Sequence, residues 1–477
     1  MKVRRFVSLS WNKTTAGWIA LCMLGLSALT LARAALAGTA RVDGAGVGLH
    51  QLWLGLLWLC FAAAAMRLYL AAVEDGPDLR QVLWAAILIH AAAALALPYS
   101  SNDIFSNLAY GRMLRLGINP YLAGPSALPA GDPFLAMVGP RWLATPSAYG
   151  PVNLALNWLS GRADSVAASM AIYKLGAFAT SIGTVLAGYA ICRRHLEGSA
   201  ARGAFAFLAL NPLLVYEVSG QAHNDGVMVL GLMLFVWAAL AECELLAVAC
   251  LALALYAKFA VAPVLGLYLV FLFRRSPLKA AAAAALVAYV GAVLFLPFWH
   301  GIATLAGPLT TISGDVTRVS RSYTDLLCSL GELCGGEAGR LWAYRLCWGV
   351  GTAFLLILAG RAITRVRSVE SVLRESLVYL LCYGLIAAPW YLSWYETWLL
   401  PLALVDRDVR LRRLVAIYTA LSVVQWCTSS AVVQGLVINT VVLTLAYRWW
   451  FKPAAAPGLP VVEAAHEMPA VGQLEEA

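Results

Sequence analysis

The segment from residue 100 to 112 carries a carboxylate that could act as a catalytic base. Wound as a helix, it places four polar side chains on one face: Asp103, Ser106, Asn107 and Tyr110. Four apolar side chains fall on the opposite face: Phe105, Leu108, Ala109 and Leu116. This pattern predicts an amphipathic helix lying in a membrane interface, with its polar face open to a site. Asp103 could equally be the cap of that helix, because aspartate is a favoured capping residue.

A second polar cluster follows an apolar run near residue 210. It contains Glu217, His223, Asn224 and Asp225. A carboxylate such as Glu217 is costly at the edge of a membrane span unless it has a partner or a function. Asn224 or Asp225 could cap the next helix, and two candidate ligands are too few to argue for a metal. If Asp103 is only a cap, Glu217 and Asp225 are the next candidates for the base.

Three cations are candidates for binding an anionic group. Lys258 lies within an apolar run, where the Tyr256 hydroxyl is its polar neighbour in the sequence, so it either snorkels to the interface or binds a ligand. Arg112 and Arg321 fall on the side of the membrane that positively charged residues usually avoid. A lipid head group or phosphate would explain them. Pairing of Arg321 with a nearby aspartate is the structural alternative.

Aromatic residues in two segments could contact a substrate. Tyr149 lies in the turn-rich segment 147–151, for which glycine and proline predict a folded loop. Trp390 and Tyr391 open the aromatic segment 389–398, which either belongs to an interfacial aromatic belt or stacks on a sugar or isoprenoid chain.

Composition identifies the elements that must position these residues. Of 477 residues, 61% are hydrophobic and 12% are charged, and the mean hydropathy is +0.76. A soluble domain carries about 25% charged residues, so a soluble fold is excluded, as is a disordered chain. Apolar runs predict an all-α polytopic membrane protein of roughly 14 membrane helices. The net charge of +9 reports membrane topology first, and nucleic-acid binding is not expected.

The distribution of Lys and Arg predicts that both termini are cytoplasmic. It also favours a helical hairpin over residues 245–273, turning near Lys258, rather than one long helix. The basic N-terminus followed by an apolar run is either a first span or a cleaved signal peptide.

We expect one transmembrane domain over residues 1–451 and a disordered cytoplasmic tail over 452–477. Two outer connections, 99–165 and 299–340, are too long to be simple turns and are expected to be functional. Cys328 and Cys334 share the second connection, and in an oxidising compartment they could form a disulfide.

Together these pieces resemble the GT-C glycosyltransferases, and more narrowly the bacterial polyprenol-phosphate-mannose-dependent alpha-(1→6)-mannosyltransferases. The resemblance is carried by Asn102–Ser106, Tyr110–Arg112, Gly117–Tyr121, Ser147–Pro151, Asn211-Pro212, His223–Asp225 and Pro389–Tyr391. It covers most of the chain, thinning at the first two spans and the tail.

The resemblance implies transfer of a sugar, mannose for the nearest members, from a polyprenyl phosphate to a hydroxyl of a glycan or glycolipid. The reaction would occur at the outer face of the bacterial cytoplasmic membrane, among membrane lipids, by inverting displacement with Asp103 as general base. Lys258, Arg321 and Arg112, in that order, would receive the departing phosphate. No cofactor is implied, and dependence on a divalent metal stays open. A transporter or lipid flippase, and a polysaccharide ligase or polymerase, are the rival functions.

Overall fold

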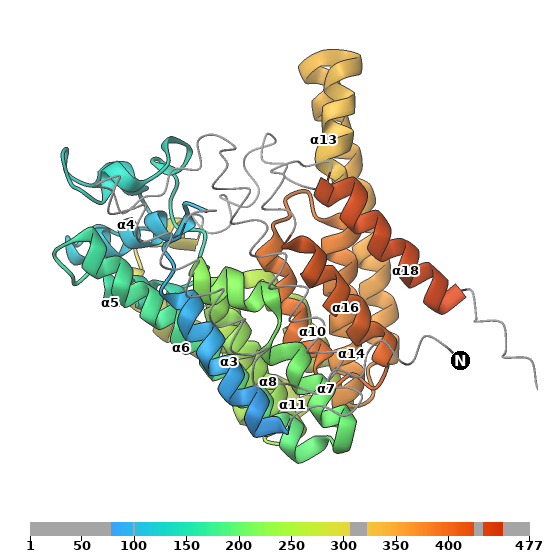
Figure 1. Ribbon diagram of the computed structural model, residues 1–477. Helices are drawn as coiled ribbons and strands as arrows, with labels where there is room; N and C mark the ends of the chain where they lie inside the picture. Colours follow the sequence, from blue (N-terminus) through green and yellow to red (C-terminus); the bar gives the residue numbers. More distant parts are fainter. Residues whose placement is uncertain (1–77, 99–100, 306–321, 424–432, 452–477) are drawn as a thin grey trace, which may run out of the picture.

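The structure is a computed structural model, and it describes residues 78–98, 101–305, 322–423 and 433–451. The described chain is a helical bundle, as the composition predicts (Figure 1). Its main helices are α3 (Leu79–Ala94), α4 (Asp103–Arg115), α5 (Pro151–Ser160), α6 (Val166–His195), α7 (Gly198–Ala209), α8 (Asp225–Leu240), α9 (Glu244–Ala257), α10 (Ala262–Arg275), α11 (Pro277–Phe295), α13 (Tyr323–Arg365), α14 (Val369–Cys382), α15 (Leu399–Ala403), α16 (Val409–Ser422) and α18 (Asn439–Phe451).

Several short helical turns connect these elements. They include the 3₁₀-helices η1 (Pro125–Ala127), η2 (Leu135–Met137), η3 (Pro140–Trp142), η5 (Phe259–Val261), η6 (Leu296–Phe298) and η8 (Ser393–Trp398). The π-helices are η4 (Leu214–Gly220), η7 (Tyr383–Ala387) and η9 (Val433–Ile438).

Among the described residues, three helices are long and apolar enough to cross a membrane: Val166–His195, Pro277–Phe298 and Tyr323–Arg365. A fourth span is counted if α7 and η4, bent by 43° at their junction, act as one. The number of roughly 14 membrane helices expected from apolar run length is therefore not confirmed. The first two apolar runs lie outside the described residues. Apolar helices such as α3, α8 and α9 are shorter than 18 residues. They count as apolar runs in the sequence but are too short to count as membrane spans in the structure, so the two numbers differ.

The hairpin expected around Lys258 is present. Helix α9 ends at Ala257, Lys258 is extended, and α10 runs back. The two helices are held together at the end far from the turn, where Glu244 at the start of α9 pairs with Arg275 at the end of α10 at 3.2 Å. Lys279 reaches the same carboxylate at 2.7 Å. A single continuous helix would hold residues 244 and 275 about 45 Å apart, so the chain must fold back.

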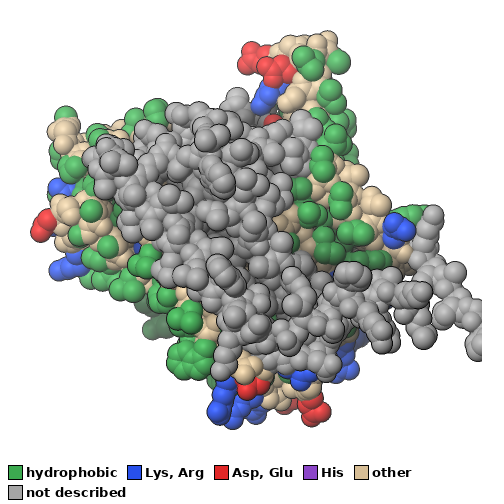
Figure 2. Space-filling model, in the orientation of Figure 1, with side chains coloured by type: hydrophobic (Ala, Val, Ile, Leu, Met, Phe, Trp, Pro, Cys, Tyr) green, Lys and Arg blue, Asp and Glu red, His purple; other side chains and the backbone are tan. Residues whose placement is uncertain are grey.

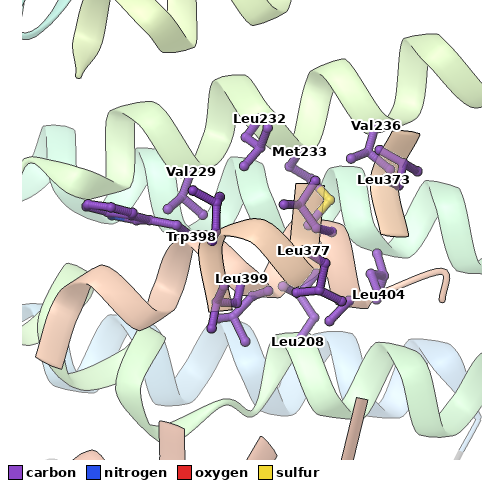
Figure 3. Close-up of a cluster of buried hydrophobic side chains, with 14 of the residues drawn as sticks. Leu208, Val229, Leu232, Met233, Val236, Leu373, Leu377, Trp398, Leu399 and Leu404 are labelled. Atoms are coloured by element: carbon purple, nitrogen blue, oxygen red, sulfur yellow. The ribbon is translucent and has the colours of Figure 1, made fainter. Parts of the chain in front are cut away.

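The main core lies between α7, α8, α14 and α15. Figure 3 shows how leucines from three of these helices meet Val229, Met233 and Val236 of α8. Trp398, at the end of η8, lies at one edge of this cluster. The core therefore anchors the segment that brings η8 to the polar cluster described below.

Helix α13 departs from the expected second outer loop. Residues 323–340 are helical rather than an irregular connection, because Ser322 caps the helix and leucines recur through it. Gly335 and Gly336 break the helix, and Glu332 then pairs with Arg340 at 2.7 Å across the break. In Figure 1 this part of α13 stands clear of the bundle.

The disulfide expected between Cys328 and Cys334 is absent. Both thiols are free, with Cys328 buried and Cys334 exposed. Because the two residues lie on one helical arm, six residues apart, their side chains cannot meet as they would in a flexible loop. The prediction was wrong because it assumed a loop.

The connection from 101 to 165 is folded, with α4, α5 and three 3₁₀ turns. Glycines let α4 and α5 cross closely: a Cβ at Gly111 would collide with the Asn157 carbonyl, and one at Gly161 with Gly111 itself. Asn107 then accepts hydrogen bonds from Asn153 at 3.1 Å and from Asn157 at 3.2 Å. These contacts hold α4 in one position on α5.

The described surface separates by polarity. In Figure 2, hydrophobic side chains cover much of the visible described flanks, whereas charged side chains lie at the lower end, at the tip of α13 and in smaller groups at the left and right edges. Exposed apolar residues such as Trp84, Leu175 and Tyr289 are expected of helices that face lipid.

Candidate active site

Asp103 begins helix α4, and its carboxylate is 28% exposed. The capping position belongs to Asn102, which makes no side-chain capping bond. The nearest cationic partner of Asp103 among the described residues is His223, with Nδ1 3.8 Å from Oδ2. The amino end of a helix also favours a negative charge. The geometry therefore presents Asp103 as a partly open carboxylate rather than as a cap.

The rest of α4 differs from the expected amphipathic helix. Beyond Asp103, the polar side chains Ser106, Asn107 and Tyr110 are buried, as are Phe105 and Leu108 on the opposite face. Asn107 bonds α5, and the Tyr110 hydroxyl donates to the Thr145 carbonyl at 2.9 Å. The helix is thus clamped inside the folded loop instead of lying on a surface. Helical spacing alone could not show that the polar face has protein partners.

Behind Asp103 lies a buried imidazole. His223 is 1% exposed, and its Nε2 lies 3.3 Å from Oε2 of Glu217, which is fully buried. Ser393 of η8 donates a 2.6 Å hydrogen bond to the other oxygen of Glu217. The Trp394 ring stacks on His223, with the centroids 3.7 Å apart. Glu217 therefore has the partner that its burial requires.

The turn that presents His223 is strained. Ala222 has a φ of +58°, in the left-handed region that side chains rarely adopt. The turn is secured by the His223 N–H, which donates to the Glu217 carbonyl at 2.9 Å. The π-helix η4 and this turn place the two side chains against each other.

Lys258 pairs with a carboxylate that sequence reasoning did not connect to it. Its ammonium is 2.8 Å from Oδ1 of Asp225, and the side chain is 17% exposed while Asp225 is fully buried. Trp398 Nε1 donates to the same oxygen at 2.6 Å. The ammonium also lies 4.4 Å from the Tyr395 ring centroid and 5.0 Å from that of Trp398. Tyr256, the neighbour expected from sequence, donates instead to the Val287 carbonyl.

Tyr149 links the two ion pairs. The Gly150 N–H donates to the Ala257 carbonyl at 3.1 Å, and a Cβ at Gly150 would collide with the Tyr256 carbonyl. The Tyr149 ring consequently lies 6.0 Å from the Lys258 ammonium. Burial raises the pKa of Tyr149, and the charges of Asp103 and Asp225 add to that rise. A neutral phenol therefore stands within the field of both carboxylates.

Other residues predicted for the site lie elsewhere. Arg112 pairs with Asp132 at 2.9 Å, as an internal contact of the loop, and Arg321 lies outside the described residues. Asn224 caps α8 by position, without a side-chain bond. Tyr110 is used by the loop, as described above.

The aromatic segment contributes different residues from those expected. Trp390 packs edge-on against Trp142 of the loop at 6.5 Å, and Tyr391 stacks on Tyr418 in the core at 6.4 Å. Trp394, Tyr395 and Trp398 contact the ion pairs instead. The i, i+3 spacing of Tyr395 and Trp398 was the signal in the sequence, since it places both rings on one face of a 3₁₀ turn.

An apolar cavity of about 540 Å³ opens beside Lys258. One wall is formed by Tyr256 and Phe259, which lie two residues before and one residue after the lysine in the sequence. The other wall is formed by one face of α11 together with η6. The lining is Tyr256, Phe259, Ala288, Gly291, Ala292, Phe295, Leu296, Trp299 and Leu305. A lysine whose sequence neighbours line an apolar cavity suits an amphiphile with an anionic head. Among the described residues, no three His, Cys, Asp or Glu side chains are arranged to hold a metal ion.

Comparison with known proteins identifies the family to which this chain is similar. Residues 13–275 match the family described as alpha-(1->6)-mannopyranosyltransferase, N-terminal domain. The chain is 29% identical over 197 residues to alpha-(1->6)-mannopyranosyltransferase A of Corynebacterium glutamicum, covering 39% of this chain and 38% of that relative. It is 32% identical over 195 residues to alpha-(1->6)-mannopyranosyltransferase A of Mycobacterium tuberculosis, covering 39% and 34%.

The matches therefore span little more than a third of these two relatives. Within this chain, the family match includes both ion pairs and Tyr149, and it ends before the aromatic residues of η8. Because the family match covers more than half of the 477 residues, the chain belongs to the alpha-(1->6)-mannopyranosyltransferase family.

Proposed function

We propose that this protein transfers mannose from a polyprenyl-phosphate donor to a hydroxyl of a glycan or glycolipid acceptor. The observation that carries the proposal is the pairing of two features in one site. A partly open carboxylate, Asp103, shares the site with an ammonium, Lys258, whose neighbour in the chain, Phe259, lines an apolar cavity. The names of the relatives support mannose as the sugar.

Each half of the site has a chemical task in this reaction. Asp103 takes the proton of the acceptor hydroxyl as its oxygen bonds to the anomeric carbon. The bond from that carbon to the phosphate oxygen breaks, and polyprenyl phosphate departs with increased negative charge. The Lys258 ammonium still has N–H groups free of its hydrogen bond to Asp225, and these stabilise the charge of the departing phosphate. A single displacement of this kind inverts the anomeric centre, so a β-linked donor gives an α product.

The donor's two parts match the two sides of Lys258. Isoprenoid units fill the apolar cavity between α9 and α11, and the phosphate meets the ammonium at its edge. We place this site at the outer face of the cytoplasmic membrane, with both termini on the cytoplasmic side. Asp225 holds the lysine, and the aromatic rings around it exclude water.

The test uses the full chain in detergent or nanodiscs with a radiolabelled polyprenyl-phosphate mannose. We expect label to move into an added mannoside acceptor, and none to be released without acceptor beyond slow hydrolysis. Movement of unchanged donor across a vesicle bilayer without a new glycoside would identify a flippase. Growth of long chains from a lipid-linked oligosaccharide would identify a polymerase. Either result would contradict the proposal.

A further inference from the structure

Three ionisable side chains form a line from the open site into the protein interior. Asp103 is partly exposed, His223 lies 3.8 Å behind it, and Glu217 lies 3.3 Å beyond the imidazole. Glu217 and His223 come from η4 and the turn that follows it, and tertiary packing brings Asp103 of α4 to them. The reaction proposed above requires only the first of them to touch substrate.

The imidazole has no freedom to turn away from this line. Trp394 stacks on one face at a 19° interplanar angle. The backbone of His223 is tied to Glu217 by the 2.9 Å hydrogen bond across the strained Ala222 turn. One ring nitrogen faces Asp103 and the other faces Glu217. A residue held in this way can fix the position of its neighbour.

We propose that His223 is the positioning residue of the catalytic base: held between Glu217 and Trp394, it orients the Asp103 carboxylate toward the open site. The inference rests on the proposed function. A buried carboxylate such as Glu217 favours a cationic neighbour, because an isolated buried charge is costly. The Asp–His–carboxylate order also leaves the open end of the line as the group that receives the substrate proton.

The groups facing His223 determine how this arrangement responds to pH. They are Glu217 from η4, Asp103 from α4 and Asp225 from α8. Burial lowers the pKa of His223, but the hydrogen bond and charge of Glu217, aided by both aspartates, raise it above 6.5 overall. A raised pKa means that the proton stays until higher pH. Activity should therefore fall on the alkaline side, when His223 loses its charge.

We call the fall in kcat at high pH the alkaline limb of the pH profile. Two substitutions should move it in opposite directions. Glu217→Gln removes the negative charge that raises the pKa of His223, so the alkaline limb should shift to lower pH. Ser393→Ala removes the hydroxyl that donates a hydrogen bond to Glu217, so the negative charge of Glu217 acts more strongly on His223 and the alkaline limb should shift to higher pH. A purely structural role would produce neither pattern.

The experiment measures kcat and donor KM for mannosyl transfer between pH 5 and 9, using the full chain with each variant. His223→Gln should lower kcat about 10- to 100-fold, abolish the alkaline limb and leave donor KM unchanged. His195→Gln, an exposed histidine at the end of α6, is the matched control. Thermal unfolding identifies a variant that does not fold, in which case the Ser393→Ala shift alone decides.

Coincident alkaline limbs in the wild type and the folded variants would overturn the inference while leaving the proposed function intact. Absence of mannosyl transfer by the wild type would overturn both. The two failures are therefore distinguishable.

Discussion

The candidate site contains two ion pairs built in opposite senses. In one, the carboxylate of Asp103 is 28% exposed and its cationic partner His223 is buried. In the other, the ammonium of Lys258 is 17% exposed and its carboxylate partner Asp225 is buried. In each pair the buried member is fixed by a further contact, from Glu217 or from Trp398. The exposed member is therefore the one that can meet substrate.

Under the proposed function, this difference gives each end of the site a separate task. An open carboxylate accepts a proton, and an open ammonium accepts an anion. The buried partners lack access, so they act through the residues they hold. Variants that remove the exposed member should impair catalysis or binding more than variants that loosen the buried one.

The largest effect is expected for Asp103→Asn, which keeps the size of the side chain and removes the proton acceptor. We expect kcat to fall about 10²- to 10⁴-fold with little change in donor KM. Asp164→Asn is the control, because that aspartate is 91% exposed and pairs with Arg115. If Asp103→Asn kept activity within a few-fold of wild type, the assignment of the exposed Asp103 carboxylate as the proton acceptor would be wrong.

Lys258→Met should act on binding. Loss of a charge-assisted contact to phosphate weakens donor affinity roughly 10- to 100-fold. Lys258→Arg should be intermediate, because the guanidinium is wider than the ammonium it replaces. Donor KM for each variant, compared with Lys279→Met at the far end of the hairpin, is the measurement. An unchanged KM would remove Lys258 from the donor site.

Ala292→Trp tests whether the cavity beside Lys258 holds the isoprenoid chain. Displacing two methylenes at about 0.8 kcal/mol each would weaken a long-chain donor roughly ten-fold. A donor with a shortened chain should lose less. Ala284→Trp, exposed on the same helix but outside the cavity lining, is the control. Equal losses for long- and short-chain donors would place the chain elsewhere.

The smallest effect is expected for Trp398→Phe, which keeps the aromatic ring and removes the donor to Asp225. A single hydrogen bond contributes about 1 kcal/mol, so a modest fall in thermal stability and a slight rise in donor KM are expected. Trp84→Phe, at a 65% exposed position on α3, should have neither effect. A loss as large as that of Lys258→Met would mean that Trp398 contacts the donor directly.

Local sequence signals predicted much of this protein. Apolar runs identified a helical membrane protein, and the charge distribution chose the hairpin that the Glu244–Arg275 contact confirms. The order of short motifs identified the family, which the match over residues 13–275 confirms. These features depend on composition and neighbouring residues, so they can be read along the chain.

Where sequence reasoning was wrong, it assumed an environment that only packing could reveal. The polar face of α4 is covered by α5 because glycines permit a close crossing. Cys328 and Cys334 lie on a helix rather than in a loop. In the aromatic segment, the start of the run packs into the loop and core, so Trp394 and Trp398 reach the site instead of Trp390 and Tyr391.

The sequence by itself determined the membrane class, the family and the ionisable residues from which a site could be made. Only the tertiary structure decided their pairing: Asp103 with His223 and Glu217, and Lys258 with Asp225. The physical reason is that the Asp103–His223 and Lys258–Asp225 pairs each join residues far apart in sequence, and the buried member of each pair requires a partner of opposite charge. Glu217 and His223, by contrast, are brought together by the local turn. No local pattern records which buried charge will face which partner, because that choice is made by helices packing together.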